Sequence, residues 1–140
     1  MMEQRISYIT LGVRNLKESE NFYSNLLGWK KTEDSSGNII FYKLNGMILA
    51  LYPVEALAFD AETVPGARCF SNFTISYNTR SKDEVDKVMF GLEKHGVKII
   101  KEPETVFWGG YRGYIADPNG FMIEVVYNPK AELDVNGNIL

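Results

Sequence analysis

The chain has 140 residues, of which 45% are hydrophobic and 24% are charged, and its formal net charge at pH 7 is −3. No run reaches the roughly 18 apolar residues of a membrane span, interspersed charges give no basic patch for nucleic acid, and the single cysteine, Cys69, excludes a disulfide framework. We therefore expect one cytoplasmic domain that binds small molecules or other proteins, with no nucleic-acid and no membrane partner.

The first half of the sequence predicts a strand, a helix and three further strands. Apolar residues alternate with polar or small ones from Tyr8 to Val13, which is the period of a strand. Asn15 occupies an N-cap position with Glu18 three residues later, and Gly28 ends the helix. Strands are expected at 29–33, 39–44 and 47–52, the last two joined by the hairpin signal Asn45-Gly46.

The second half repeats this order at an offset of about 64–68 residues. A strand at 70–77 precedes a helix that has Ser81 and Glu84 as its capping box and Gly96 as its stop. Strands follow at 97–101, 110–116 and 121–127, with a turn at 117–120. The single domain of residues 1–140 thus divides into module 1 (about 5–52), a connection (53–67), module 2 (about 68–129) and a tail (130–140). The connection is either a solvated linker or a segment that reaches over a cleft, and the tail is a small hairpin or a frayed end.

Two paired βαβββ modules, the segment NLKESENFYSNLLGW from Asn15 and the closing DPNGFMIEVVYNP from Asp117 resemble the vicinal oxygen chelate superfamily. This superfamily includes glyoxalase I, bleomycin-resistance proteins and extradiol dioxygenases. ALYPVEALAFDAET and FWGGYRGYIADPNG resemble a bacterial glyoxalase-like subgroup whose members mostly lack an assigned reaction. The resemblance implies an α+β fold in which two tandem βαβββ modules form a half-barrel cleft for metal and substrate.

The resemblance also places the four ligand positions of the superfamily's metalloenzymes on Tyr8, Ala50, Asn72 and Glu124, and only Glu124 has the expected type. A catalytic divalent metal generally needs three or more ligands such as His and carboxylate. The lone histidine, His95, precedes a helix-ending glycine, where it is expected to contact terminal carbonyls. We therefore expect no metal, no other cofactor, and neither metal-dependent glyoxalase I nor dioxygenase activity.

Glu124 lies in an apolar strand and has two interpretations. It is either a structural carboxylate hydrogen-bonded to Tyr8, Asn72 or a threonine, or it binds a cationic or hydrogen-bond-donating ligand or removes a proton. Trp108 and Tyr111 follow Phe107, earlier in the chain, in a glycine-rich stretch suited to closing over a flat or aliphatic ligand. The sequence therefore predicts a ligand site lined by Tyr8, Asn72, Trp108, Tyr111 and Glu124, with Glu124 as the candidate catalytic residue.

Three functional hypotheses follow. The first is a metal-independent protein of the glyoxalase/bleomycin-resistance type, a homodimer that binds a small organic molecule in a concave pocket. The alternative is a divergent enzyme, an isomerase or lyase, with Glu124 as general base and Tyr8 or Asn72 polarising the substrate. The third is an interaction module whose pocket is filled by side chains. The sequence leaves open whether any reaction is catalysed and whether the cleft lies within one chain or between two.

Overall fold

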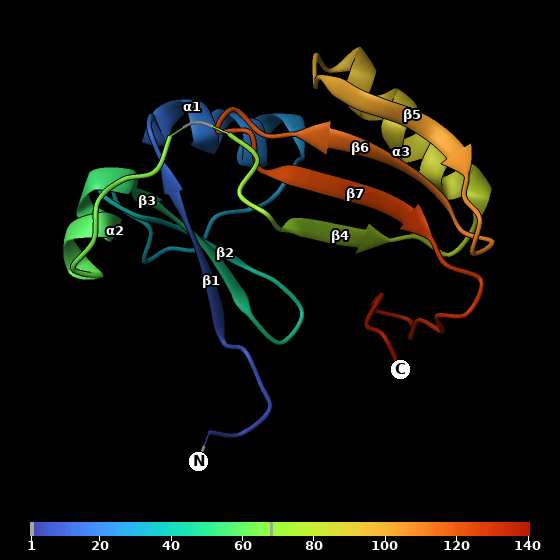
Figure 1. Cartoon of the computed structure of the whole chain (residues 1–140), viewed down its shortest axis with the longest axis horizontal. Helices are drawn as coiled ribbons and strands as arrows, with labels where there is room; N and C mark the ends of the chain where they lie inside the picture. The colour runs from blue at the N-terminus through green and yellow to red at the C-terminus, as the bar shows by residue number, and fades with distance from the viewer. Residues whose placement is uncertain (1, 68) are drawn as a thin grey trace. The chain divides into compact units, whose positions relative to one another are not determined.

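The computed structural model describes residues 2–67 and 69–140, and the chain forms two compact units, Met1–Ala67 (unit 1) and Arg68–Leu140 (unit 2). The elements of both units are labelled in Figure 1. Within the described residues, none of the helices combines the length and apolar character needed to cross a membrane.

Unit 1 is a three-stranded sheet in which two helical segments follow the first strand and a third helix follows the last strand. Strand β3 is central, parallel to β1 and antiparallel to β2. The predicted N-cap is confirmed, because the Asn15 side chain accepts a hydrogen bond from the Glu18 amide at 3.0 Å. The elements are β1 (Tyr8–Val13), α1 (Leu16–Glu20), the π-helical segment η1 (Asn21–Leu26), β2 (Ile40–Lys43), β3 (Ile48–Pro53) and α2 (Val54–Asp60).

The strand predicted at 29–33 is reduced to one isolated bridge, between Lys31 and Tyr42. The Trp29 amide donates to the Tyr23 carbonyl at 2.9 Å, so Trp29 completes the end of η1 instead of starting a strand. Its indole also packs against Tyr23 and Tyr42, with ring centroids 5.6 and 5.9 Å away. Tertiary packing of an aromatic side chain therefore overrides the local strand preference here.

The segment that follows module 1 begins with helix α2, which packs against β1 and β3. Gly12 permits this contact, since a Cβ atom there would lie 3.1 Å from Cγ2 of Val54 and 3.3 Å from Cδ2 of Leu57. Leu11 and Val13 point to the opposite face of β1 and are fully or almost fully buried. About half of the expected connection is therefore ordered helix held on the sheet.

Unit 2 is a four-stranded sheet in the order β4-β7-β6-β5, with α3 packed against β5, β6 and β7 (Figure 1). The Ser81 hydroxyl accepts a hydrogen bond from the Glu84 amide at 3.1 Å, which confirms the predicted N-cap. The Glu84 carboxylate accepts from the amide of Arg80 and not from that of Ser81, so the reciprocal bond is displaced by one residue. The elements are β4 (Thr74–Asn78), α3 (Lys82–Lys94), β5 (Ile99–Thr105), β6 (Tyr111–Ala116) and β7 (Met122–Tyr127).

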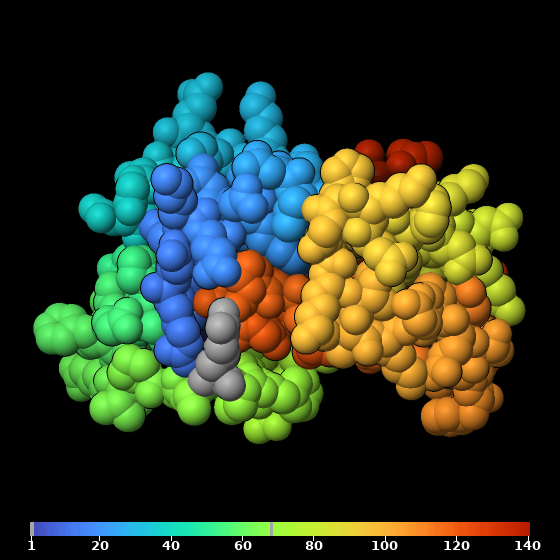
Figure 2. Space-filling view, turned by 90° about the horizontal axis from the view of Figure 1, so that it is seen from above, coloured from blue at the N-terminus to red at the C-terminus, as the bar shows by residue number. Residues whose placement is uncertain are grey.

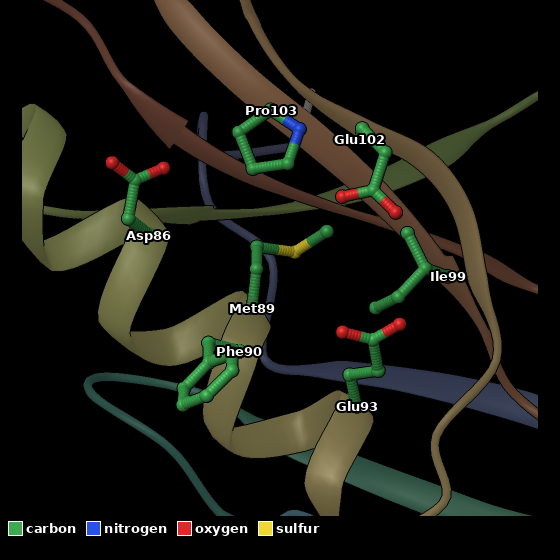
Figure 3. Close-up of a pocket in the computed structure, with 7 residues that line it drawn as sticks. All are labelled: Asp86, Met89, Phe90, Glu93, Ile99, Glu102 and Pro103. Carbon is green, nitrogen blue, oxygen red and sulfur yellow. The ribbon is translucent and has the colours of Figure 1, made fainter.

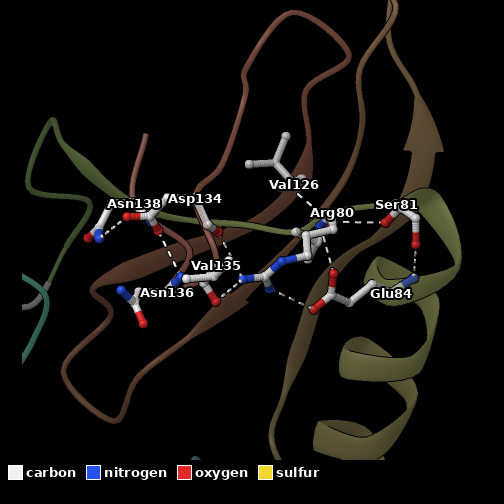
Figure 4. A network of polar contacts seen from close by, with 9 residues as sticks. Arg80, Ser81, Glu84, Val126, Asp134, Val135, Asn136 and Asn138 are labelled. Atoms are coloured by element: carbon white, nitrogen blue, oxygen red, sulfur yellow. Dashed lines mark hydrogen bonds and ion pairs between the residues drawn. The ribbon is translucent and has the colours of Figure 1, made fainter. Parts of the chain in front are cut away.

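The tail forms a small closed turn attached to the start of α3 (Figure 4). Leu133 and Ile139 form an isolated antiparallel bridge, and the Asp134 carboxylate accepts from the amides at positions 136 and 138. Arg80 Nη2 donates to the carbonyls of Asp134 and Val135 at 3.3 and 3.1 Å. Of the two alternatives for the tail, the structure therefore shows the ordered turn.

The expected α+β fold is confirmed, as two sheets of three and four strands. One boundary matters for the site: the strand predicted at 70–77 begins only at Thr74. Asn72 has a φ of 61°, a left-handed conformation that cannot continue an extended strand. Asn72 therefore does not share the strand face that the sequence assigned to it.

Candidate functional site

The candidate site is a row of polar side chains across the open face of the unit 2 sheet. Gly113 faces α3, since a Cβ atom there would lie 2.7 Å from Cε of Met89. The next residue, Tyr114, points to the other face. Tyr114 is opposite Glu124 on β7 and opposite Lys101 on β5, and Glu124 is opposite Ser76 on β4. We call Ser76, Glu124, Tyr114 and Lys101 the polar row.

Glu124 is held by hydroxyl groups from the two strands beside it. Ser76 Oγ donates to Oε2 at 2.7 Å, and Tyr114 OH donates to Oε1 at 3.2 Å. Glu124 and Tyr114 are half-buried, whereas Ser76 is exposed. The partners of Glu124 are thus a serine and a tyrosine of its own sheet, and not the Asn72 or threonine side chains considered from the sequence.

The cation of the polar row, Lys101, and the neighbouring Arg112 are paired with Glu104 and not with Glu124. Glu104 Oε1 accepts from Lys101 Nζ at 2.6 Å and from Arg112 Nη1 at 3.1 Å. The hydrogen bond from Lys101 is the largest cause that lowers the pKa of Glu104, and the hydrogen bond from Arg112 lowers it further. Within the described part of the chain, no Lys, Arg or His side chain forms an ion pair with Glu124. Among the described residues of this unit, the Glu124 carboxylate therefore has neutral hydroxyl donors as its side-chain partners.

Tyr114 donates to Glu124 and lies beside Arg112, which is a partner of Glu104. Burial raises the pKa of its hydroxyl, and the charge of Glu124 and the hydrogen bond to it raise this pKa further. The guanidinium of Arg112, 5.4 Å from the centre of the Tyr114 ring, acts in the opposite direction. At neutral pH Tyr114 is therefore a protonated donor that fixes the orientation of Glu124.

The donors at Glu124 do not fit a divalent metal. One carboxylate with two neutral hydroxyls lacks the three or more His, Cys or acidic ligands that catalytic sites use. Within residues 2–67 and 69–140, no group of three or more such side chains is placed to hold a metal ion. His95 caps its helix, with Nδ1 2.7 Å from the Gly91 carbonyl oxygen.

The structure does not bring Tyr111 and Glu124 together. Tyr111 OH donates to Oδ1 of Asp86 on α3 at 2.7 Å, so its ring lies on the helix side of the sheet. Strand alternation places Tyr111 and Tyr114 on opposite faces. Trp108, in the turn between β5 and β6, packs over Gly110, where a Cβ atom would lie 1.9 Å from the indole. The glycine-rich stretch therefore has a structural use, the packing of its own tryptophan.

Tyr8 belongs to the sheet of unit 1. It is 55% exposed, and its ring centroid is 6.4 Å from that of Phe41 in an edge-to-face contact. Ala50, the second unit 1 position that the resemblance indicated, is opposite Thr10 and Phe41 and is buried. Neither supplies an ionisable group suited to binding a divalent metal.

Comparisons with known proteins define the class of the chain. The family model of the Glyoxalase/Bleomycin resistance protein/Dioxygenase superfamily matches residues 5–125, and the chain belongs to this superfamily. A glyoxalase-related enzyme from Fulvimarina pelagi is 30% identical, with a TM-score of 0.88 over 99% of this chain and 98% of that one.

Two further solved structures share the fold. A lactoylglutathione lyase from Agrobacterium tumefaciens is 23% identical, with a TM-score of 0.71 over 91% of this chain and 96% of that one. A glyoxalase/bleomycin resistance protein/dioxygenase from Nocardioides is 19% identical, with a TM-score of 0.77 over 96% and 92% of the two chains. No curated protein matches the chain significantly.

Proposed function

We propose that this protein binds a small organic molecule without a metal ion, and that the ligand presents a cationic or hydrogen-bond-donating group to Glu124. The observation that carries the proposal is that, among the described residues, both Glu124 oxygens accept hydrogen bonds only from neutral hydroxyls. A carboxylate has about four acceptor positions, so two remain for a ligand. Superfamily membership supports a small-molecule function in general terms.

Each residue near Glu124 has a defined part in this proposal. Ser76 and Tyr114 hold the carboxylate in one orientation, which reduces the entropy lost on binding. Arg112 and Lys101 are occupied by Glu104 and do not compete for the Glu124 charge. Of the predicted lining residues, Asn72 and Trp108 belong to unit 2 and are kept in the proposal as outer contacts of the ligand, whereas Tyr8 belongs to unit 1 and is not assigned to this site. Tyr111 is left out, because its hydroxyl bonds to α3.

A second candidate function is catalysis, with Glu124 as general base in an isomerase or lyase. The same observation supports it, since Ser76 and Tyr114 hold the carboxylate in one orientation and leave acceptor positions for a substrate proton. Tyr114, whose O–H donates to the carboxylate, would keep this base oriented toward the substrate. We further propose a cytoplasmic homodimer. The exposed free thiol of Cys69 suits a reducing compartment, and the dimer rests on the family resemblance.

The test is a thermal-shift screen of metabolites and antibiotics against the wild type and the Glu124→Gln variant. A ligand at 100 times its dissociation constant stabilises a protein by about 2.7 kcal/mol, which a melting curve resolves. Hits should be weakened by Glu124→Gln and unaffected by Glu132→Gln, a matched change at an exposed position of the tail. Hits that bind Glu124→Gln as tightly as the wild type would overturn the proposal, and turnover of a hit would select the enzyme.

A further inference from the structure

Unit 2 contains a cavity that is separate from the polar row. It lies between α3 and β5, on the helix side of the sheet, and has a volume of about 200 Å³ (Figure 3). Helix α3 and strand β5 face the viewer in Figure 2. The floor of the cavity is apolar and is formed by Met89, Phe90, Ile99 and Pro103.

The course of β5 explains why the cavity exists. The pairing of β5 with β6 shifts register twice, between Ile99 and Lys101 and between Lys101 and Glu104. Bulges of this kind bend a strand and redirect its side chains. Gly113 on β6 lets the displaced strand come close, since a Cβ atom there would lie 2.8 Å from the Lys101 carbonyl oxygen. The bent segment carries Glu102 and Pro103 over the side of α3.

Acidic side chains occupy the rim of the cavity. Asp86 is already an acceptor for Tyr111. Glu93, from α3, and Glu102, from β5, form no ion pair or hydrogen bond with any other described side chain. Figure 3 shows their carboxylates on the same side of the cavity, beside Ile99. Both residues are exposed and have the same sign of charge, so this rim attracts a cation.

We propose that this cavity is a second binding site, for an amphipathic organic cation that has an ammonium group and a short aliphatic body. The ammonium would lie between Glu93 and Glu102, and the aliphatic body would lie against Ile99, Pro103 and the part of Phe90 that is not covered by Lys94, whose Nζ is 4.3 Å from the ring centre. Charge complementarity selects the cation, and the apolar floor selects an organic body over a hydrated ion. A metal ion does not suit these residues, because they are not among any group of three or more ligand side chains in the described chain.

The proposal is tested by NMR titration of the full-length protein with n-hexylammonium, using 1-hexanol as a probe with the same body and no charge. We expect saturable shifts of amide signals at positions 89, 90 and 99 with the amine and weaker binding of the alcohol. The double variant Glu93→Gln/Glu102→Gln should weaken amine binding roughly three- to tenfold, as expected for two partly exposed ion pairs.

One control variant, Glu132→Gln in the tail, should leave the amine affinity unchanged, and the spectra of all variants report whether they are folded. Equal affinity for hexanol, undiminished binding to the double variant, shifts confined to the strands around Glu124, or no saturable shift would each overturn the proposal. Loss of ligand binding by Glu124→Gln alone concerns the proposed function and leaves this second site intact.

Discussion

The hydroxyl of Tyr114 donates to the carboxylate of Glu124 across the β6–β7 ladder at 3.2 Å, and the two residues are directly opposite in register. Because the backbone pairing fixes both Cα positions, the contact belongs to the sheet and does not depend on a mobile loop. Ser76 approaches the same carboxylate from β4 at 2.7 Å. A carboxylate fixed in this way presents its free lone pairs in one direction.

This relationship predicts how Tyr114 titrates. Its pKa is raised above the ordinary value of 10.0 by burial first and by Glu124 second. Glu124→Gln should therefore lower the pKa of Tyr114 without returning it fully to that value. NMR of ζ-carbon-labelled tyrosine measures this directly. Tyr111, whose pKa is raised by its hydrogen bond to Asp86, is the internal control and should not respond.

The sign of the corresponding stability change follows from the same shift. A raised pKa means that the folded state retains the Tyr114 proton at a pH where the unfolded chain has lost it. The stabilisation is therefore complete below about pH 10 and is lost as the pH rises through the folded pKa. Tyr114→Phe should remove this part of the alkaline destabilisation in urea melts between neutral and alkaline pH. An identical alkaline loss in both proteins would contradict it.

Two glycines of unit 2 predict opposite effects of alanine. At Gly113 a Cβ atom would lie 2.8 Å from the backbone oxygen of Lys101, so Gly113→Ala must shift β5. We expect it to lower the free energy of unfolding by roughly 1–3 kcal/mol. Gly91, within α3, has open space around the same atom, so Gly91→Ala should raise the free energy of unfolding by about 0.5–1 kcal/mol. Denaturant unfolding of both variants checks the pair, and equal effects would contradict the close approach at Gly113.

Arg80 is predicted to hold the tail. Its Nη2 atom reaches two carbonyl oxygens at 3.3 and 3.1 Å, which a single lysine ammonium does not reproduce in the same planar geometry. Arg80→Lys should accelerate amide exchange at positions 136 and 138 and leave the exchange of β6 and β7 amides unchanged, since local opening is independent of global unfolding. Arg5→Lys, at an exposed position of unit 1, is the matched control.

The same turn should open at low pH. The side-chain hydrogen bond from Asn138, followed by the amide of that residue, lowers the pKa of Asp134 below 3.8. Because the pKa of Asp134 is lowered by folding, the turn is fully stabilised at a pH above the pKa of an unfolded aspartate. This stabilisation is lost as the pH falls through the lower pKa of Asp134 in the folded protein. Protection of the amides at positions 136 and 138, measured relative to their intrinsic exchange at each pH, should therefore fall only in strong acid. Loss of this protection near neutral pH would show that Asp134 is not responsible.

The purified protein should carry no stoichiometric Zn, Ni, Fe or Mn. Glu124 and two neutral hydroxyls of unit 2 do not make a divalent site. Elemental analysis before and after chelation, with methylglyoxal and glutathione as assay substrates, provides the measurement. One tightly held metal per chain, or turnover that depends on a metal, would refute the prediction.

Much of unit 2 follows from local signals in the sequence. Ser81 and Gly96 mark the ends of α3, and the turn at 117–120 separates β6 from β7. The partner of Glu124 does not follow from them. Ala116 pairs with Met122, so five residues lie between the strands, and this loop places Tyr114 opposite Glu124. A loop one residue shorter would place Glu124 on the opposite face from Tyr114.

Tyr111 and Asn72 show two other features of the site that the sequence does not determine. Aromatic residues in a glycine-rich stretch are equally consistent with a ligand loop and with packing on a helix, and only the contact with Asp86 separates these alternatives. A single left-handed residue at Asn72 moves the start of β4, and such a backbone choice depends on its surroundings. The sequence places Ser76 on the same strand face as Thr74. Its contact with Glu124 could not be predicted, because the sequence does not show that β7 is the strand beside β4.

The last prediction separates binding from folding at Glu124. Glu124→Gln keeps the size of the side chain and an oxygen that accepts from Ser76 or Tyr114, while it removes the charge. We expect the free energy of unfolding to change by less than about 1 kcal/mol, because the carboxylate has no ion pair in the described sheet whose loss would be costly. Ligand affinity should fall by about 1.5–3 kcal/mol, the range for a charged hydrogen bond.

Glu124→Met tests the same residue from the opposite side. It removes the acceptor of both hydroxyl groups. The exposed Ser76 hydroxyl can donate to water instead, whereas the half-buried Tyr114 hydroxyl loses its carboxylate acceptor. If Glu124 serves only the sheet, Met or Gln should leave ligand binding intact, and removing a half-buried charge can raise the melting temperature. Parallel melting curves and ligand titrations of the three proteins decide between these outcomes. A more stable variant with undiminished binding would show that Glu124 is a structural residue, because its charge would then contribute nothing that a neutral side chain does not.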